Sequence, residues 1–346
     1  PQGRPAGCCA LLDLGQWFGG QRVSALGVAA VAIAPDFRGQ GAALHLMQQA
    51  LQEMADRGAA LSALYPATQT LYRRVGYGPG GMFGNWELPL HTLDPKRILA
   101  GDPPLDWRPA DPGATDLHPL YTQWARPQSG CLDRSPVIWG EVLKPEDEIP
   151  ASTYQVFDGD RSVGYIALAQ TRQGRDTVLH VRDWVALTPT AGRHLWAFVA
   201  RYQSQVDTLR WRGPALDPML TLLPEQRAKA ITLISWFTRI LNVPQALSQR
   251  GYPAGLTGEL HLQVIDPFLT NNHGNWVLQV SQGIGQATPG GRGDVILTHQ
   301  GLASLYTGLY SGHQLAALGH IEGDTPVLHW ASTLFAGTTP WMPDFF

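Results

Sequence analysis

Apolar and polar positions change period several times along residues 1–84, and each change predicts an element. Two alternating stretches, residues 7–14 and 22–34, predict strands with a glycine-rich turn between them. After Gly41, apolar residues return at spacings of 3, 4 and 3, which predicts an amphipathic helix that ends at Gly58. The other elements expected here are a buried strand at 61–65, a short helix at 68–75 and a chain break at the glycines of 76–81.

The same order of elements returns in the second part of the chain. Residues 94–119 are rich in proline and aspartate and are expected to form a linker. From the end of this linker onward, the expected elements are a helix at 117–125, strands at 154–157, 163–170 and 178–187, a helix at 192–206 and a strand at 208–211. The sequence Ala-Leu-Thr-Pro at 186–189 matches Ala-Ile-Ala-Pro at 32–35, an offset of 154 residues, which indicates a duplicated fold.

The last third begins near Leu233 and ends in an apolar tail. Its expected elements are a helix at 243–249, strands at 258–265, 275–280 and 294–298, a loop at 287–293, and helices at 301–310 and 312–318. The tail Trp-Met-Pro-Asp-Phe-Phe, at 341–346, differs from the usual polar and mobile terminus, so we expect it to dock against folded protein. These patterns predict an α/β (α+β) protein with three domains, at 1–84, 85–232 and 233–346.

Length, charge and cysteine content limit the classes of protein to which this sequence can belong. The 346 residues are too many for one ordinary core, which supports two or three domains. The net charge is −3, with the excess of acids in the last third, so the chain lacks the basic stripe of a nucleic-acid-binding protein. Only 15% of residues are charged, which leaves apolar surface for contacts between copies. No signal peptide or membrane-spanning run appears and three cysteines give no disulfide framework, so we expect a cytoplasmic protein without a membrane partner.

The most informative segment follows the second expected strand. Residues 28–33 are apolar, Pro35 ends the strand, and the loop Arg38-Gly39-Gln40-Gly41-Ala42-Ala43 opens directly into the helix. A strand, a glycine-bearing turn and a helix N-terminus together present backbone N–H groups and a partial positive charge. The segment therefore predicts a site for a phosphate or pyrophosphate group.

This loop resembles the acetyl-CoA motif of the GNAT acetyltransferases, Arg/Gln-x-x-Gly-x-Gly/Ala. Three further features resemble one branch, the enhanced-intracellular-survival (Eis) family: the segment Leu-Tyr-Pro-Ala-Thr-Gln-Thr-Leu-Tyr-Arg-Arg-Val-Gly-Tyr-Gly at 64–78, the second copy of the fold, and a last third similar to sterol carrier proteins. The resemblance implies tandem GNAT folds, a sterol-carrier-like domain, and an N-acetyltransferase that moves acetyl from acetyl-CoA to a primary amine of a small molecule or to a lysine side chain. It also implies that residues preceding this sequence complete the first fold and the acceptor pocket, and that the protein is a homo-oligomer, with a hexamer as the family precedent.

For the cofactor, the resemblance places the pyrophosphate of acetyl-CoA on the backbone N–H groups of residues 38–43. Glycine at 41 permits close approach of the backbone. Backbone contacts with the pantetheine arm and the thioester carbonyl are assigned to Val31 and Ile33. Gly39 is a departure, because other members often carry arginine there. The second copy lacks Gly-x-Ala after its proline, and it is expected to bind no cofactor.

For the chemistry, the resemblance assigns the general acid to Tyr72, whose phenol stays protonated at neutral pH and can protonate a leaving thiolate. Tyr77 is expected to be structural. The general base is assigned to the terminal carboxylate of Phe346, and Asp344 adds negative field for a cationic acceptor. We expect direct attack by the amine, because none of the three cysteines has a neighbouring base in the sequence.

Other functions stay open at this point. The last third can instead enclose an apolar ligand near Trp276, Leu305 and Tyr306, as sterol carriers do, or the protein can be a scaffold with a dead site. The eleven histidines show no metal-ligand spacing, so no metal is expected. No Gly-x-Ser-x-Gly sequence occurs, so serine nucleophile chemistry has no support.

Overall fold

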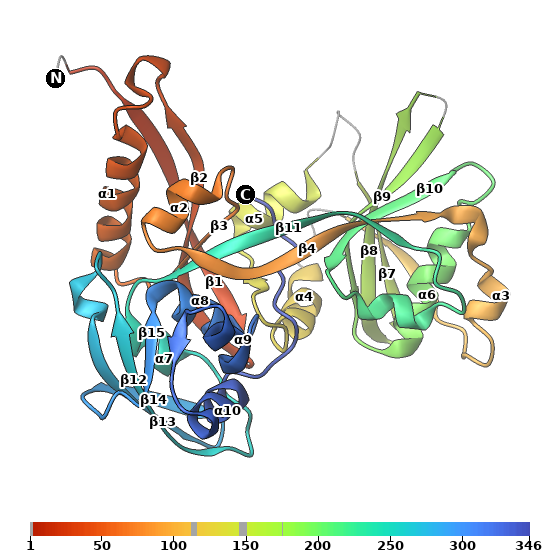
Figure 1. Cartoon of the computed structure of the whole chain (residues 1–346). Coiled ribbons are helices and arrows are strands. Elements are labelled where there is room, and N and C mark those ends of the chain that lie inside the picture. The colour runs from red at the N-terminus through yellow and green to blue at the C-terminus, as the bar shows by residue number, and fades with distance from the viewer. Residues whose placement is uncertain (1–2, 112–115, 145–150, 175) are drawn as a thin grey trace. The chain divides into compact units, whose positions relative to one another are not determined.

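Strands β4 (Gly78–Pro89) and β11 (Lys229–Ile240) each run through both of the units into which the chain divides (Figure 1). The computed structural model describes residues 3–111, 116–144, 151–174 and 176–346. The first unit comprises Pro1–Gly81, Arg126–Asp133 and Ser235–Phe346, and the second comprises Met82–Ala125 and Arg134–Ile234.

The N-terminal part of the first unit is a sheet built on a long hairpin. The second half of β11 joins strands β1 (Gly7–Phe18), β2 (Gln21–Ile33), β3 (Leu61–Leu64) and β6 (Leu132–Asp133), in the order β11-β3-β2-β1-β6. β2 is antiparallel to β1 and parallel to β3. The two helices here are α1 (Ala42–Asp56), which follows the 3₁₀ turn Pro35–Phe37, and α2 (Gln69–Arg74). α1 packs against β1 and β2 through Met47, Leu51 and Met54, the apolar spacing seen in the sequence (Figure 1).

The C-terminal part of the first unit holds a second sheet, in the order β14-β13-β12-β15-β16. The strand bounds are Thr257–Ile265 (β12), Gly274–Ser281 (β13), Ile284–Pro289 (β14), Val295–Thr298 (β15) and Ile321–Glu322 (β16). The helices are α7 (Val243–Gln249), α8 (His299–Thr307), α9 (Gly312–Ala317) and α10 (Thr325–Leu334), with a 3₁₀ turn at Thr270–Asn272. After α10, residues 336–346 form a tail without helix or strand.

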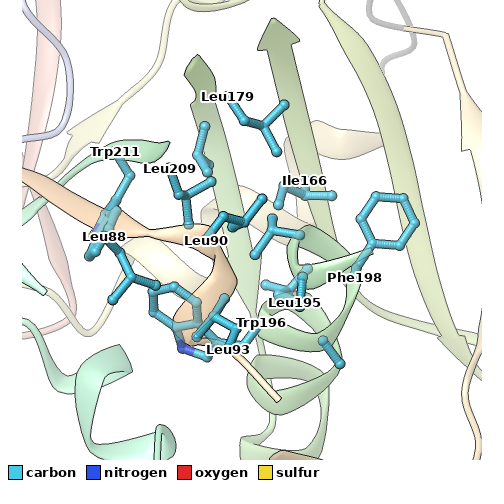
Figure 2. Packing of buried hydrophobic residues seen from close by; sticks show 14 of the residues in the cluster. Leu88, Leu90, Leu93, Ile166, Leu179, Leu195, Trp196, Phe198, Leu209 and Trp211 are labelled. Atoms are coloured by element: carbon cyan, nitrogen blue, oxygen red, sulfur yellow. The ribbon is translucent and has the colours of Figure 1, made fainter. Parts of the chain in front are cut away.

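The second unit repeats the order of strand, helix and strand around an aromatic core. The first half of β11 lies in this unit, and the other strands have the order β5-β7-β8-β9-β10-β4. Their bounds are Asp106–Ala110 (β5), Ser152–Asp158 (β7), Arg161–Gln173 (β8), Asp176–Ala186 (β9) and Thr208–Pro214 (β10). The helices are α3 (Pro95–Ile98), α4 (Leu117–Ala125), α5 (Pro136–Leu143) and α6 (Pro189–Ala200), with 3₁₀ turns at Leu90–Thr92 and Pro218–Leu222. Trp196 and Phe198 of α6 pack into a cluster with Leu88, Leu90 and Trp211 (Figure 2).

Two expectations about these elements are wrong, and each has a physical reason. The glycines at 76–81 do not break the chain, because β4 begins at Gly78. A Cβ at Gly80 would lie 2.3 Å from the ring of Trp236, so this glycine permits a close approach within a strand. Residues 94–119 hold α3, β5 and the start of α4 rather than a linker, since Asp94 caps a helix that begins with proline. Besides these, six helices and strands were not expected, namely β6, α5, β11, β14, β16 and α10.

A buried ion pair links β11 to the C-terminal part of the first unit. Nη2 of Arg239 lies 2.7 Å from Oδ1 of Asp266, and neither side chain is more than 1% exposed. The carboxylate also accepts hydrogen bonds from the N–H groups of Phe268 and Leu269. Burial acts to raise the pKa of Asp266, but the hydrogen bond and charge of Arg239, together with the two backbone hydrogen bonds, outweigh burial and hold this pKa below its ordinary value.

Replacement of this carboxylate is expected to destabilise the first unit. Asp266→Asn should lower the free energy of unfolding at pH 7 by about 3–5 kcal/mol, because it leaves the charge of Arg239 buried without its partner. Since the folded-state pKa of Asp266 lies below the unfolded one, the stabilisation is present above about pH 4 and is lost as the pH falls through the folded value. Urea denaturation at several pH values measures the difference. Asp294→Asn is the matched control, because its ion pair with Arg292 is exposed and is worth at most about 1 kcal/mol; equal losses in both variants would contradict the prediction.

Candidate active site

β2 and β3 lie side by side for a short distance and then diverge. Their parallel pairing joins Ala25, Leu26 and Gly27 to residues 61–63, although β2 continues to Ile33. Beyond Gly27, this edge of β2 has no partner strand in the described part of the chain. Its backbone donors and acceptors are therefore available to a ligand.

A bulge lies in the diverging part of β2. The register with β1 shifts between Cys8 and Ala10 on the partner strand. On β2 itself, Ala30 has a φ of +50°, which is rare for a residue with a side chain. Such bulges bend a strand, redirect its side chains and are frequent beside active sites.

Beyond the bulge, the backbone direction of β2 can be assigned. The N–H of Ala34 donates to the carbonyl of Ala6 at 2.9 Å, on the β1 side. Because N–H groups alternate in direction along a strand, those of Val31 and Ile33 point toward the diverging edge. The side chain of Arg38 reaches the same edge, where its Nε donates to the carbonyl of Ile33 at 3.2 Å.

Residues 38–43 form a turn with two left-handed glycines. Gly39 has a φ of +75° and Gly41 a φ of +83°, conformations that cost a residue with a side chain about 1–2 kcal/mol. A Cβ at either position would meet no atom within 4 Å, so the space in front of the turn is open. The side chain of Gln40 donates to the carbonyl of Asp36 at 2.9 Å, which braces the turn from within.

The helix that follows this turn begins without a side-chain cap. Gly41 is the N-cap of α1, and no side chain accepts a hydrogen bond from the first turn. That turn, with Ala42, Ala43 and Leu44, contains no acid. Its N–H groups have no acceptor within the helix, and the helix dipole adds positive potential. The open space, the donors and the dipole together fit a pyrophosphate group.

In the second unit, the N–H groups in the first turn of the corresponding helix, α6, are not available to a ligand. α6 begins at Pro189, which has no N–H, and the side chain of Thr188 accepts a hydrogen bond from the N–H of Ala191 at 3.1 Å. A Cβ at Gly192 would lie 2.5 Å from the side chain of Leu222, so the first turn is also crowded. The donors that are open at α1 are therefore removed, bonded or covered at α6.

Tyr72 lies on α2 with 5% of its surface exposed. Its ring meets that of Tyr77 edge to face at 6.1 Å, in the same core cluster as Leu26 and Val28 of β2. Burial raises the pKa of the Tyr72 phenol, and the thiol of Cys9 adds to the rise. The phenol is thus protonated at neutral pH and can give up a proton.

Neither Cys9 nor Cys131 is activated as a nucleophile. Cys131 is completely buried. Burial raises the pKa of the Cys9 thiol, and the neighbouring Cys8 and Glu53 raise it further. The reactive thiolate form is therefore disfavoured at Cys9.

The tail after α10 is anchored within the first unit. The N–H of Trp341 donates to the carbonyl of Ser129 at 3.0 Å. The phenol of Tyr65 donates to the carbonyl of Met342 at 2.9 Å. The side chains of Trp341, Met342 and Asp344 are buried. The expectation of a docked tail is therefore confirmed.

Phe346 packs against β2, and Tyr72 belongs to a core cluster that includes residues of the same strand. The ring of Phe346 packs against Gly27, the last residue of β2 that pairs with β3. Tyr72 shares a cluster with Leu26 and Val28, which flank Gly27, and successive side chains of a strand alternate between faces. No hydrogen bond joins Tyr72 to Phe346 among the described residues. The structure thus places Phe346 at the last residue pair of β2 and β3, and Tyr72 in the core cluster that contains the neighbours of Gly27.

Three residues of this region were not singled out from the sequence. A glycine inside an apolar strand often marks a place where another group packs closely against the backbone, so this role of Gly27 could have been predicted from the sequence. Ala30 and Tyr65 carry no such signal. An alanine in a bulge looks like any other strand alanine, and Tyr65 looks like the last residue of a buried strand.

The side chains considered for lipid binding fill the protein core. Trp276, Leu305 and Tyr306 are all at most 8% exposed. The ring of Tyr306 meets that of Phe18 at 5.2 Å, and the guanidinium of Arg250 lies 5.1 Å from its centre. These contacts commit the side chain of Tyr306 to internal packing.

The described residues contain no group of three or more His, Cys, Asp or Glu side chains that could hold a metal ion. In the same residues, no helix is both long enough and apolar enough to cross a bilayer.

Comparisons with known proteins agree with this geometry. Profiles of three families match the chain: an acetyltransferase (GNAT) domain at residues 2–80, an acetyltransferase (GNAT) domain at 130–240 and a sterol carrier protein domain at 243–343. A GCN5-related N-acetyltransferase from Anabaena variabilis, known from its crystal structure, is 41% identical with a TM-score of 0.93, over 98% of this chain and 86% of that one. An uncharacterized N-acetyltransferase of Streptomyces griseus is 29% identical over 95% of this chain and 83% of its own length. The N-acetyltransferase Eis of Mycobacterium tuberculosis is 27% identical over 91% of this chain and 78% of its own length.

Proposed function

Because the chain belongs to the GCN5-related N-acetyltransferases, as an Eis homologue with two such domains and a sterol carrier domain, we propose that it transfers acetyl from acetyl-CoA to a primary amine by direct attack. The family, the mixed α/β fold and the class of enzyme expected from the sequence are confirmed. The proposed acceptor is a small-molecule amine or a lysine side chain.

The observation that carries the proposal is a difference between two helices: the first-turn N–H groups are open at α1, whereas those of α6 are bonded or covered. Acetyl-CoA, when bound, supplies the activated acetyl group. The backbone of residues 38–43 would bind its pyrophosphate, since the two left-handed glycines add no side chain to the open space in front of the turn. The N–H groups of Val31 and Ile33, which point to the diverging edge of β2, would orient the acyl arm. The second unit is proposed to bind no acetyl-CoA, because its donors are used internally.

Two residues are proposed to move protons. Tyr72 would donate its phenolic proton to the sulfur that leaves, a role supported by its place in the core cluster that contains Leu26 and Val28 of β2. The α-carboxylate of Phe346 would accept a proton from the attacking amine, a role supported by the packing of its ring at the end of the β2–β3 pairing. The buried Asp344 would add negative potential that favours a cationic acceptor.

A negative charge introduced into the first turn of α1 is expected to change CoA affinity and helix stability in opposite directions. Ala43→Asp should weaken CoA binding by about tenfold or more, because a carboxylate in the first turn repels the pyrophosphate. The same carboxylate suits the positive end of the helix, so the melting temperature should stay equal or rise. Isothermal titration with CoA and thermal unfolding measure the two effects.

Ala43→Asn is the matched control, since it adds nearly the same volume without charge. Its effect on CoA affinity should be clearly smaller than that of the aspartate. Equal affinities in wild type and Ala43→Asp would show that no phosphate group lies at this helix.

Turnover assays identify the acceptor and test the rival function. Acetyl-CoA is offered with polyamines, aminoglycosides and lysine peptides, and release of free CoA is followed with a thiol reagent. A lipid-binding protein would instead co-purify with an apolar ligand and bind no CoA, which native mass spectrometry detects.

A further inference from the structure

Gly27 occupies a place in β2 where the backbone does not require glycine. It lies in the last residue pair that β2 shares with β3, and its φ is outside the left-handed region. A Cβ at this position would lie 2.6 Å from the ring of Phe346 and 2.7 Å from a methyl group of Leu14. A side chain here would be too close to both of them. The glycine therefore supplies the space in which the ring of Phe346 lies.

Tyr65 holds the same end of the tail from another side. It follows β3 directly, so its backbone lies where β3 leaves β2. Its phenol donates to the carbonyl of Met342 at 2.9 Å. Its ring lies 4.6 Å from that of Phe345 and meets that of Phe346 nearly edge-on at 6.1 Å. One side chain thus contacts three of the last five residues.

These contacts act on the last two residues of the tail. Residues up to Met342 are secured by the hydrogen bond of Trp341 and by burial. Phe345, in contrast, has 51% of its surface exposed. Gly27 and Tyr65 both contact this last part of the tail, so both help to fix the position of the last residue.

We propose that Gly27 and Tyr65 are positioning residues that form a seat for Phe346 and so fix the place of its α-carboxylate where β2 and β3 diverge. The proposal rests on the proposed function only for the part that this carboxylate plays in acetyl transfer. Occupation of the seat is a separate property, and it can be measured without any turnover.

Carboxypeptidase digestion measures the seat directly. The enzyme must draw the last residues into its own active site, so the rate of phenylalanine release follows how often the tail leaves the seat. In a protein that ends at Phe346, we expect slow release from wild type and release that is faster by about tenfold or more from Gly27→Ala and Tyr65→Leu. Tyr65→Phe keeps the ring and loses the hydrogen bond, so its release should be intermediate.

Kinetics measure what the seat does for the reaction. kcat should fall by about tenfold or more in Gly27→Ala and Tyr65→Leu, because small displacements of a reacting group are costly. KM for acetyl-CoA and the affinity for CoA should stay within about twofold, since the turn at 38–43 is untouched. In a background where two glycines follow Phe346, Tyr65→Leu should cause no further loss of kcat, as expected if Tyr65 acts only through the tail.

Two substitutions elsewhere serve as matched controls. Gly140→Ala also adds one methyl group, at a site with no atom within 4 Å of the new Cβ, and should change neither release nor kcat. Tyr310→Phe removes a phenol from a half-buried tyrosine of the first unit, and among the described residues no hydrogen bond or ring contact joins Tyr310 to the tail. Thermal unfolding of every variant identifies those that do not fold, and Tyr65→Phe keeps the test available if Gly27→Ala is among them.

The possible results separate the two proposals. Release at the wild-type rate from both Gly27→Ala and Tyr65→Leu would overturn the seat, whatever the turnover. Faster release with unchanged kcat would show that the seat exists but does not position a catalytic group, which overturns the positioning role. Faster release, lower kcat and no additional loss in the extended background support the proposal. If wild type binds no CoA, the proposed function fails while the release rates still decide about the seat.

Discussion

Adding two glycines after Phe346 is expected to lower kcat for acetyl transfer by about 10²- to 10⁴-fold, the usual contribution of a general base. The addition converts the α-carboxylate of Phe346 into an amide, which cannot accept a proton from the amine. The new carboxylate lies up to about 7 Å further along the chain, beyond hydrogen-bond reach of the original position. The ring of Phe346 and the hydrogen bonds of Trp341 and Met342 keep their partners, so the fold should be unaffected.

A shortened protein gives an independent control. Deletion of Phe346 moves the carboxylate to Phe345, whose side chain is 51% exposed, and should cause a loss of similar size. CoA affinity should stay the same in both variants, because the turn at 38–43 is not altered. A kcat within about twofold of wild type in the extended protein would mean that the base lies elsewhere.

Tyr72→Phe is expected to lower kcat by about 10²-fold or more, because it removes the proton donor and keeps the ring in its core cluster. The pH profile gives a second readout. Since burial raises the pKa of Tyr72, the protonated form persists beyond the ordinary tyrosine value of about 10, and wild-type kcat should hold until the pH exceeds it. The residual kcat of the variant should show no such alkaline limb.

Tyr77→Phe is the matched control for this substitution. Its phenol is completely buried and lies 2.7 Å from Oγ of Ser62. Loss of this hydrogen bond should cost about 1 kcal/mol of stability with little change in kcat. If the two variants lost the same factor in kcat, the assignment of the acid to Tyr72 would be contradicted.

Local signals explain which elements could be predicted from the sequence. α7 was expected at 243–249 and has these bounds. Two local signals mark its start: the side chain of Asn242 accepts a hydrogen bond from the N–H of Gln245, and a proline lies in the first turn. β4 was missed because the glycines at its start serve contacts with Trp236, which are tertiary. β11 was missed because its first half is exposed and its second half buried, so no single period describes it. The division into three domains stays a prediction.

The candidate site also has one part that could be predicted from the sequence and one part that could not. The turn at 38–43 and its helix are continuous in the sequence, so the pattern of strand, glycine and helix predicts an anion site there. Gly27, Tyr65 and Phe346 are far apart along the chain and meet only in the folded state. Their residue types alone, a glycine in a strand and two aromatic rings, describe many ordinary cores.

The two strands shared by both units have a practical consequence for anyone who wishes to express part of this protein. A cut after residue 84 falls inside β4, and a cut before residue 233 falls inside β11. Each resulting fragment would keep only part of a strand, and the unpaired backbone groups at that edge would favour aggregation. Work on the isolated N-terminal part would therefore need a redesigned join between the broken strand ends, and the intact chain is the better starting material.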